Sequence, residues 1–126
     1  FPTRRSSDLT FYGMRTLEEA DPEFHPYYEG AMEKRDMAYH QGTVWTFPLG
    51  AYYLAYLKVH AYSERAKQDV KEQLEVLECA LKEGCIGQLP EIYDGKNPVS
   101  SKGCFAQAWS VGELLRVYEQ IEKKKK

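Results

Sequence analysis

The residues best suited to chemistry lie in two polar clusters that combine carboxyl, amide and imidazole groups with large aromatic rings. The first cluster is QLPEIYDGKNPVSSKG at residues 88–103, in which Glu91 and Asp94 flank Tyr93. Its prolines and glycines interrupt regular structure, so we expect a loop. The second cluster is YHQGTVW at residues 39–45. Such groups suit a neutral, polyhydroxylated ligand, and we expect both clusters to line one sugar-binding cleft.

Several residues are candidates for contact with the sugar. They are His40, Gln41, Trp45, Tyr93, Asp94 and Gln107. Imidazole and amide groups hydrogen-bond to hydroxyl groups, and an indole ring can stack on the apolar face of a sugar. Two alternatives stay open: Trp45 can be a core residue of the helix that follows it, and Asp94 can cap a turn. Gln107 and Trp109 are too close in sequence for both to face inward, so we expect Gln107 in the cleft and Trp109 packed.

The composition limits the class of protein. With 126 residues, of which 43% are hydrophobic and 29% charged, the chain fits one small globular domain or a piece of a larger one. The net charge of −2 argues against nucleic-acid binding, and no apolar run is long enough to predict a membrane span. The three cysteines have no zinc-ligand spacing and favour a reducing, cytoplasmic location. We expect no metal and no cofactor.

The first nine residues, FPTRRSSDL, resemble the in-frame translation of a widely used sequencing adapter. We interpret residues 1–9 as an assembly scar and exclude them from the fold, as for any segment that is not native. Residues 10–126 are then expected to be the C-terminal fragment of a longer protein whose N-terminal part is missing.

Hydrophobic periodicity predicts three helices, over residues 44–60, 64–83 and 105–122. The first is apolar on most sides, with Pro48 tolerated near its first turn, so it should be buried between others. The second has Ser63 as its N-cap and one narrow apolar stripe, so it should lie outside its neighbours. The third has Val111 and Leu115 on its inner side. Residues 10–37 lack periodicity and are expected to be irregular, and residues 38–42 to form a loop.

An order of inner, outer and inner helices is that of an α/α toroid, although three helices cannot close a ring. Strand signals are weak, and the nearest, at residues 91–93, is too short to count. We therefore expect an all-α fold, a partial toroid of alternating inner and outer helices with long loops.

Four motifs carry a resemblance to a known family. They are GMRTL at residues 13–17, YHQGTVW at 39–45, EIYDG at 91–95 and GCFAQAWSVGELLR at 103–116. In this order and at these spacings they are similar to the C-terminal part of bacterial glycogen debranching enzymes, in the amylo-α-1,6-glucosidase region. The resemblance covers nearly all of the chain after residue 9. One departure is Thr46, where the family usually has proline after the tryptophan.

The resemblance implies an (α/α)6 barrel that removes single α-1,6-linked glucose branches from glycogen or a limit dextrin. Such enzymes resemble inverting glycosidases, whose two carboxyl groups stand roughly 6.5–9.5 Å apart. Glu91 matches the family's C-terminal catalytic glutamate and is our candidate for the general base, in preference to Asp94. The general acid would lie far upstream, outside this chain, so we expect the isolated fragment to be inactive.

Two other functions stay open at this point. A non-catalytic helical scaffold could bind a glycan or a protein, and a related (α/α)6 hydrolase could act on trehalose or another α-glucoside. An unpaired carboxylate among aromatic rings favours an enzyme, because a scaffold has no need of one. The choice of linkage depends on subsites from elsewhere in a barrel, so the sequence does not separate the hydrolases.

Overall fold

Helices make up most of the regular structure, and a small sheet joins the segments between them. The computed structural model describes residues 9–83 and 86–123. The helices are α1 (Met32–Tyr39), α2 (Pro48–Val59), α3 (Glu64–Glu78), the 3-10 helix η2 (Cys79–Lys82) and α4 (Ala108–Glu122). The strands are β1 (Met14–Arg15), β2 (Val44–Trp45), β3 (Ile92–Tyr93) and β4 (Ser101–Lys102).

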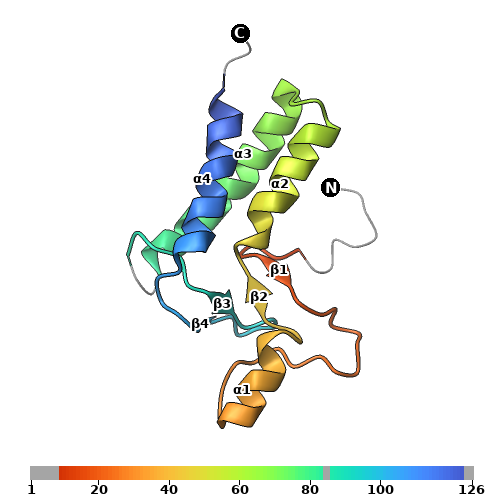
Figure 1. Ribbon diagram of the computed structural model, residues 1–126, viewed down its shortest axis with the longest axis vertical. Helices are drawn as coiled ribbons and strands as arrows, with labels where there is room; N and C mark the ends of the chain where they lie inside the picture. Colours follow the sequence, from red (N-terminus) through yellow and green to blue (C-terminus); the bar gives the residue numbers. More distant parts are fainter. Residues whose placement is uncertain (1–8, 84–85, 124–126) are drawn as a thin grey trace.

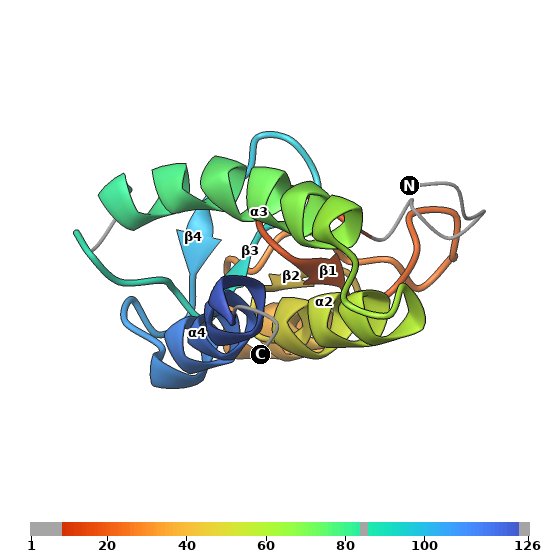
Figure 2. The same cartoon turned by 90° about the horizontal axis from the view of Figure 1, so that it is seen from above.

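Two helices form one layer and a third covers it. α2 and α4 lie side by side, and α3 packs along one side of the pair (Figures 1 and 2). The sheet lies at the end where α2 and α4 begin, and α1 lies beyond the sheet (Figure 1). α3 runs in the opposite direction, so the chain returns to the sheet before α4 starts (Figure 1). Both polar clusters are therefore gathered at one end of the helices.

Local sequence signals explain where α2 and α3 begin. Pro48 occupies the first turn of α2, where its missing N–H removes no helical hydrogen bond. The Ser63 hydroxyl accepts a hydrogen bond from the Ala66 N–H at 3.3 Å, so Ser63 is the N-cap of α3, as the sequence predicts. The helix predicted over residues 44–60 begins only at Pro48, later than expected.

The expectation of an all-α fold is wrong, because the described residues include a four-stranded antiparallel sheet in the order β1-β2-β3-β4. Trp45 of β2 pairs with Met14 on one side and with Ile92 on the other. Residues 91–93, dismissed as too short for a strand, include β3. Valine, tryptophan, isoleucine and tyrosine favour strands where partners are available. These partners are distant in sequence, so periodicity in a short window does not reveal them.

Other boundaries also differ from the prediction. α1 forms where the sequence predicts an irregular segment and a loop. Periodicity does not detect this helix, because its buried residue is Ala38 and it has no apolar stripe. α3 ends at Glu78 and continues as η2. α4 begins at Ala108 rather than at residue 105, because Gln107 still has an extended backbone.

One apolar cluster fills the space between α2, α3 and α4. Its buried side chains are Leu49, Tyr53, Leu57, Ala66, Val70, Leu74, Leu77, Ala80, Leu89, Leu114 and Val117. The apolar stripe predicted for the second helix is confirmed, because Ala66, Val70, Leu74 and Leu77 of α3 all lie in this cluster. By contrast, Val59 on α2 is 81% exposed and Leu115 on α4 is 61% exposed. Each of these two helices has neighbours on only part of its circumference, so some of its apolar surface stays uncovered. No helix of the described residues is long and apolar enough to cross a membrane.

The close approach of β1 to β2 predicts that Gly13 cannot be replaced. A Cβ at Gly13 would lie 2.2 Å from the Trp45 carbonyl oxygen, which belongs to backbone that cannot rotate away. We expect Gly13→Ala to lower the free energy of unfolding by about 1–3 kcal/mol. The control is Gly112→Ala, since a Cβ there meets nothing within 4 Å, and alanine favours helix over glycine by up to about 1 kcal/mol. Urea denaturation followed by tryptophan fluorescence compares the two; equal stabilities would contradict the packing argument.

The buried phenol of Tyr53 predicts a loss of stability in alkali. Burial, with a smaller effect of Tyr52, raises the pKa of Tyr53 to about 12. Below about pH 10 the phenol is protonated in both the folded and the unfolded chain; between about pH 10 and 12 only the unfolded chain readily ionises, so stability falls by about 2–3 kcal/mol. Tyr53→Phe should remove this contribution from unfolding free energies measured between pH 9 and 12. An identical pH dependence of both chains would show that the buried phenol is not responsible.

Candidate functional site

Glu91 lies immediately before β3, and both of its carboxylate oxygens accept hydrogen bonds. The Tyr39 hydroxyl donates to Oε1 across 52 residues of sequence, and the Cys104 N–H donates to Oε2 at 2.9 Å. The Glu91 N–H in turn donates to the Cys104 carbonyl oxygen at 2.8 Å. The side chain is half-buried. The backbone pairing of β3 and β4 therefore continues to Glu91 and fixes the position of its carboxylate.

Gly103 leaves the space that this carboxylate occupies. A Cβ at Gly103 would lie 2.5 Å from Oε2 and 3.1 Å from Cβ of Glu91. Gly103 also has φ +69°, a left-handed conformation that residues with side chains rarely adopt. Both the conformation and the close contact require glycine at this position.

Tyr39, at the end of α1, connects Glu91 to a group of aromatic rings. Its ring lies 4.9 Å from Trp45 in an edge-to-face arrangement and 5.6 Å from Tyr28. Burial raises the pKa of Tyr39 to about 12, and the hydrogen bond to Glu91 and the charge of that carboxylate contribute. The phenol therefore keeps its proton at neutral pH and can donate it in a hydrogen bond.

Trp45 is the centre of this aromatic group and is only 4% exposed. Its indole N–H lies 3.1 Å from the Tyr39 carbonyl oxygen and 3.2 Å from the Thr43 hydroxyl, and both accept from it. The exposed His40 ring stacks on the indole at 5.2 Å with an interplanar angle of 12°. Of the two alternatives for Trp45, the structure favours a core position, and His40 presents the open surface above it.

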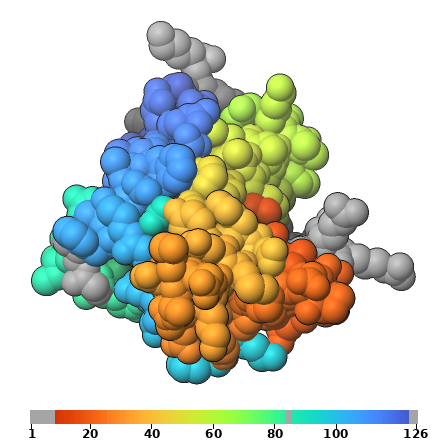
Figure 3. All heavy atoms as spheres, turned by 60° about the horizontal axis from the view of Figure 1, so that its bottom comes forward, coloured from red at the N-terminus to blue at the C-terminus, as the bar shows by residue number. Residues whose placement is uncertain are grey.

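Trp109 borders the same group from α4. Its ring stacks on Phe47 at 4.7 Å and meets Trp45 edge-to-face at 6.3 Å. Trp109 is 49% exposed, so the expectation that it is packed away from solvent is wrong. On the face shown in Figure 3, the segment leading from α1 into α2 borders the segment that begins α4. His40 and Trp109 are thus exposed aromatic rings that both contact a buried indole.

Two hydrogen bonds join the start of α4 to the loop that carries Glu91. The Gln107 N–H donates to the Leu89 carbonyl oxygen at 2.8 Å, and the Ser110 hydroxyl donates to the Pro90 carbonyl oxygen at 3.2 Å. The Gln107 side chain is half-buried and lies two residues before Trp109 in the sequence. These bonds hold the first turn of α4 against the backbone next to Glu91.

Tyr93 is buried, and Gln41 is half-buried with its side-chain oxygen out of contact with solvent. The Gln41 side-chain oxygen is buried and has no hydrogen-bond partner among the described residues. Tyr93 is 1% exposed and stacks on Tyr12 at 4.5 Å, and burial raises the pKa of its phenol far above the usual range. The Tyr93 hydroxyl likewise lacks a partner within the described ranges. Contact of either side chain with a sugar stays a prediction.

Asp94, the rival of Glu91, is 3% exposed. Its Oδ1 accepts the Tyr28 N–H at 3.1 Å, and its Oδ2 lies 3.8 Å from the Lys102 ammonium. Burial raises the pKa of Asp94, while the Tyr28 N–H and Lys102 act in the opposite direction. These contacts fasten the Tyr28 backbone to the loop after β3, which favours the structural alternative left open by the sequence.

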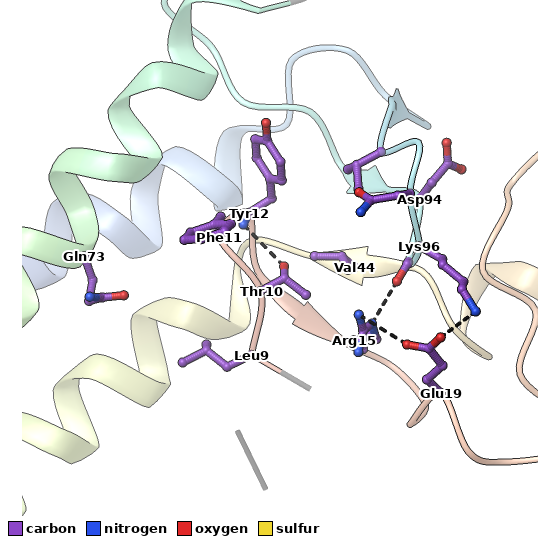
Figure 4. A pocket seen from close by; sticks show the side chains of 13 residues that line it. Leu9, Thr10, Phe11, Tyr12, Arg15, Glu19, Val44, Gln73, Asp94 and Lys96 are labelled. Carbon is purple, nitrogen blue, oxygen red and sulfur yellow. Dashed lines mark hydrogen bonds and ion pairs between the residues drawn. The ribbon is translucent and has the colours of Figure 1, made fainter. Parts of the chain in front are cut away.

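A pocket of about 830 Å³ lies between β1, the loop after β3 and α3, away from Glu91 (Figure 4). Arg15, Glu19 and Lys96 border it; the Glu19 carboxylate lies 2.5 Å from the Lys96 ammonium and 3.9 Å from the Arg15 guanidinium. The Asp94 carboxylate points away from these three groups (Figure 4). Because Glu91, His40 and Trp109 do not line this pocket, it is separate from the site around Glu91.

The structure brings some of the predicted residues together and separates others. Glu91, His40 and Trp45 are connected through Tyr39, and Gln107 lies on the adjoining turn. Tyr93 and Asp94 make their contacts elsewhere. In residues 9–83 and 86–123, no three His, Cys, Asp or Glu side chains gather in a way that could hold a metal ion.

Sequence reasoning missed the contacts of Tyr39 and Gly103 with Glu91, and those of Phe47 and Trp109 with Trp45. Tyr39 and Gly103 stand inside motifs that the sequence singles out, and a glycine in a polar loop is a signal for a close approach. The hydrogen bond between Tyr39 and Glu91 gives no sequence signal, because it joins segments that meet only through the sheet.

Comparison with known proteins gives one match. Residues 4–116 match the amylo-alpha-1,6-glucosidase family, and this range includes part of the segment that we interpret as a scar. Neither the curated proteins nor the solved structures include a match to this chain. The family match extends over most of the sequence and contains both polar clusters. The chain therefore belongs to the amylo-alpha-1,6-glucosidase family, the glucosidase region of glycogen debranching enzymes.

Proposed function

We propose that this chain is the C-terminal part of an (α/α)6 glucosidase and supplies the general base, Glu91, for inverting hydrolysis of single α-1,6-linked glucose branches. The substrate is a glucan such as glycogen or a limit dextrin, and the enzyme acts in the cytoplasm. In this mechanism the Glu91 carboxylate takes a proton from the attacking water. A second carboxyl group, from the N-terminal part of the same protein, protonates the leaving oxygen.

The observation that carries the proposal is the environment of the Glu91 carboxylate. It has fixed hydrogen-bond donors, Tyr39 and the Cys104 N–H, and no ion pair found among the described residues includes it. A positioned carboxylate without a cationic partner is available to accept a proton from water. Buried charges are usually paired with an opposite charge, so a half-buried carboxylate without a cationic partner is distinctive.

Asp94 does not supply the second carboxyl group in this proposal. It is 3% exposed, and its two oxygens face the Tyr28 N–H and the Lys102 ammonium. An inverting glycosidase needs room for a water between its two carboxyl groups and the sugar, and a buried turn residue offers none. This supports a general acid outside the chain.

Aromatic surfaces next to Glu91 support a sugar as the ligand. His40 is exposed above Trp45, and Trp109 is half exposed on Phe47. Sugar rings present apolar C–H faces that stack on such rings, while the hydroxyl groups at the ring edge need polar partners such as Gln107. Trp45 supports both exposed rings from below, while contact of Gln41, Tyr93 and Asp94 with the sugar stays part of the proposal.

The helix arrangement supports a place in a toroid. α2 and α4 begin at the same end and lie side by side, with α3 antiparallel behind them (Figure 2). Two neighbouring inner helices and one outer helix of a toroid would be arranged in the same way. The uncovered apolar residues on α2 and α4, such as Val59 and Leu115, would pack against the remaining helices of the ring.

Glu91→Gln in the complete glucosidase tests the general base. The amide cannot accept the proton of the attacking water, so we expect kcat for glucose release from a limit dextrin to fall by about 10²–10⁴-fold. Oligosaccharide binding, measured by calorimetry, should be retained because the amide has nearly the same shape.

The matched control is Glu29→Gln, which removes an exposed loop carboxylate and should leave kcat unchanged. The isolated 126-residue chain, which lacks a general acid in this proposal, serves as the blank. Unchanged turnover of Glu91→Gln, or glucose release by the blank, would refute the proposed role and favour a non-catalytic scaffold.

Trp109→Ala tests the aromatic surface. Removing a stacking partner worth about 0.5–1.5 kcal/mol should raise KM for the limit dextrin up to about tenfold, with kcat changed much less. Trp109→Phe keeps a ring face that can stack both on Phe47 and on a sugar, and should restore most of the affinity. An unchanged KM in Trp109→Ala would show that the substrate does not reach this surface.

A further inference from the structure

We propose that Tyr39 and the Cys104 N–H are positioning groups that together orient the Glu91 carboxylate toward the water, and that Gly103 is required to admit it. This inference rests on the proposed function, because it assigns roles around the same base. The groups involved come from three segments, which are the end of α1, the loop before β3 and the turn after β4.

The geometry determines which part of the carboxylate remains available. The Tyr39 hydroxyl donates to Oε1, and the Cys104 N–H donates to Oε2 at 2.9 Å. Two donors on two different oxygens fix rotation about the last bond of the side chain, which a single donor leaves free. Each carboxylate oxygen has a second lone pair, so accepting one hydrogen bond leaves capacity for a water.

The backbone prevents Glu91 from moving away from these donors. The Glu91 N–H donates to the Cys104 carbonyl at 2.8 Å, so the same two residues are joined by backbone as well as by side chain. Gly103, directly before Cys104, lies so close that a Cβ would be 2.5 Å from Oε2. A larger residue must therefore displace either the carboxylate or the turn that supplies its donor.

Tyr39 is itself held in place. Its ring contacts Tyr28, His40 and Trp45, and its carbonyl oxygen accepts the Trp45 indole N–H at 3.1 Å. Its pKa of about 12 keeps the phenol protonated throughout the range in which a glucosidase works. Tyr39 therefore acts as a fixed donor to the carboxylate and does not compete with it for a proton.

The pH dependence of activity reports on this arrangement. The titratable or charged groups on neighbouring segments are Tyr28, Tyr39, His40, Asp94, Lys102 and Cys104. Of these, Tyr39 and the backbone of Cys104 contact the Glu91 carboxylate. Loss of a donor to an ionised carboxylate makes protonation easier, so the acid limb of the pH–activity profile should move to higher pH.

The main test is Tyr39→Phe in the complete enzyme. We expect kcat to fall about 10- to 100-fold, since a displaced base loses alignment with the water, while KM changes little. The acid limb of kcat should also move to higher pH. The matched control is Tyr28→Phe, which removes a hydroxyl from the neighbouring ring and should leave both kcat and the acid limb unchanged.

A pair of glycine variants tests the space around Glu91. Gly103 and Gly87 both have positive φ, +69° and +76°, but a Cβ at Gly87 meets nothing within 4 Å. Gly103→Ala and Gly87→Ala therefore impose similar backbone strain, and only the first displaces Glu91. We expect Gly103→Ala to lose kcat at least tenfold more than Gly87→Ala.

A measurement without substrate separates this inference from the proposed function. In the 126-residue chain, the titration midpoint of Tyr39, followed by NMR of its labelled ring, should fall toward the ordinary tyrosine value in Glu91→Gln. The inference is overturned if that midpoint does not move, or if Tyr39→Phe keeps the kcat and acid limb of the unmodified enzyme while Glu91→Gln is inactive. In the latter case Glu91 is still the general base, and only the proposed positioning role of Tyr39 is rejected.

Discussion

The rest of the structure depends on the backbone pairing of four short strands. Each has two residues, yet the pairing joins Met14 to Trp45, Ile92 to Lys102, and the two central strands to each other. Three stretches that are far apart in the sequence, around β1, β2 and the β3–β4 pair, thereby meet at one end of the helices. Hydrogen bonds within such short strands are few, so the packing of α2, α3 and α4 beside them must stabilise the arrangement.

Close backbone contacts between the loops leave room only for glycine at two positions. A Cβ at Gly95 would lie 1.8 Å from the Gly42 carbonyl oxygen, and a Cβ at Gly42 would lie 2.7 Å from the His25 carbonyl oxygen. The loops approach one another backbone to backbone, without intervening side chains. Such contacts have little freedom to adjust, which suits a site that must hold a carboxylate in one orientation.

The two carboxyl groups of the loop around β3 illustrate how environment separates roles. Asp94 is buried and faces an N–H group and an ammonium group, so it fastens the chain. Glu91 is half-buried and accepts hydrogen bonds from the Tyr39 hydroxyl and the Cys104 N–H. Among the described residues it forms no ion pair. Three residues apart, one carboxyl group stabilises the loop, and the other is the group that we propose as the general base.

The sequence by itself determined the family, the stripe on α3 and the Ser63 cap, because motifs, periodicity and capping are local features of the chain. The role of Glu91 as general base is a prediction from one of these motifs. Only the tertiary structure decided that Val44 and Trp45 form a strand and that Trp109 is exposed. It also decided that Tyr39 donates to Glu91. Strand pairing, burial and side-chain contacts between distant segments depend on which backbones meet, and that is set by the packing of the whole chain rather than by any short window of it.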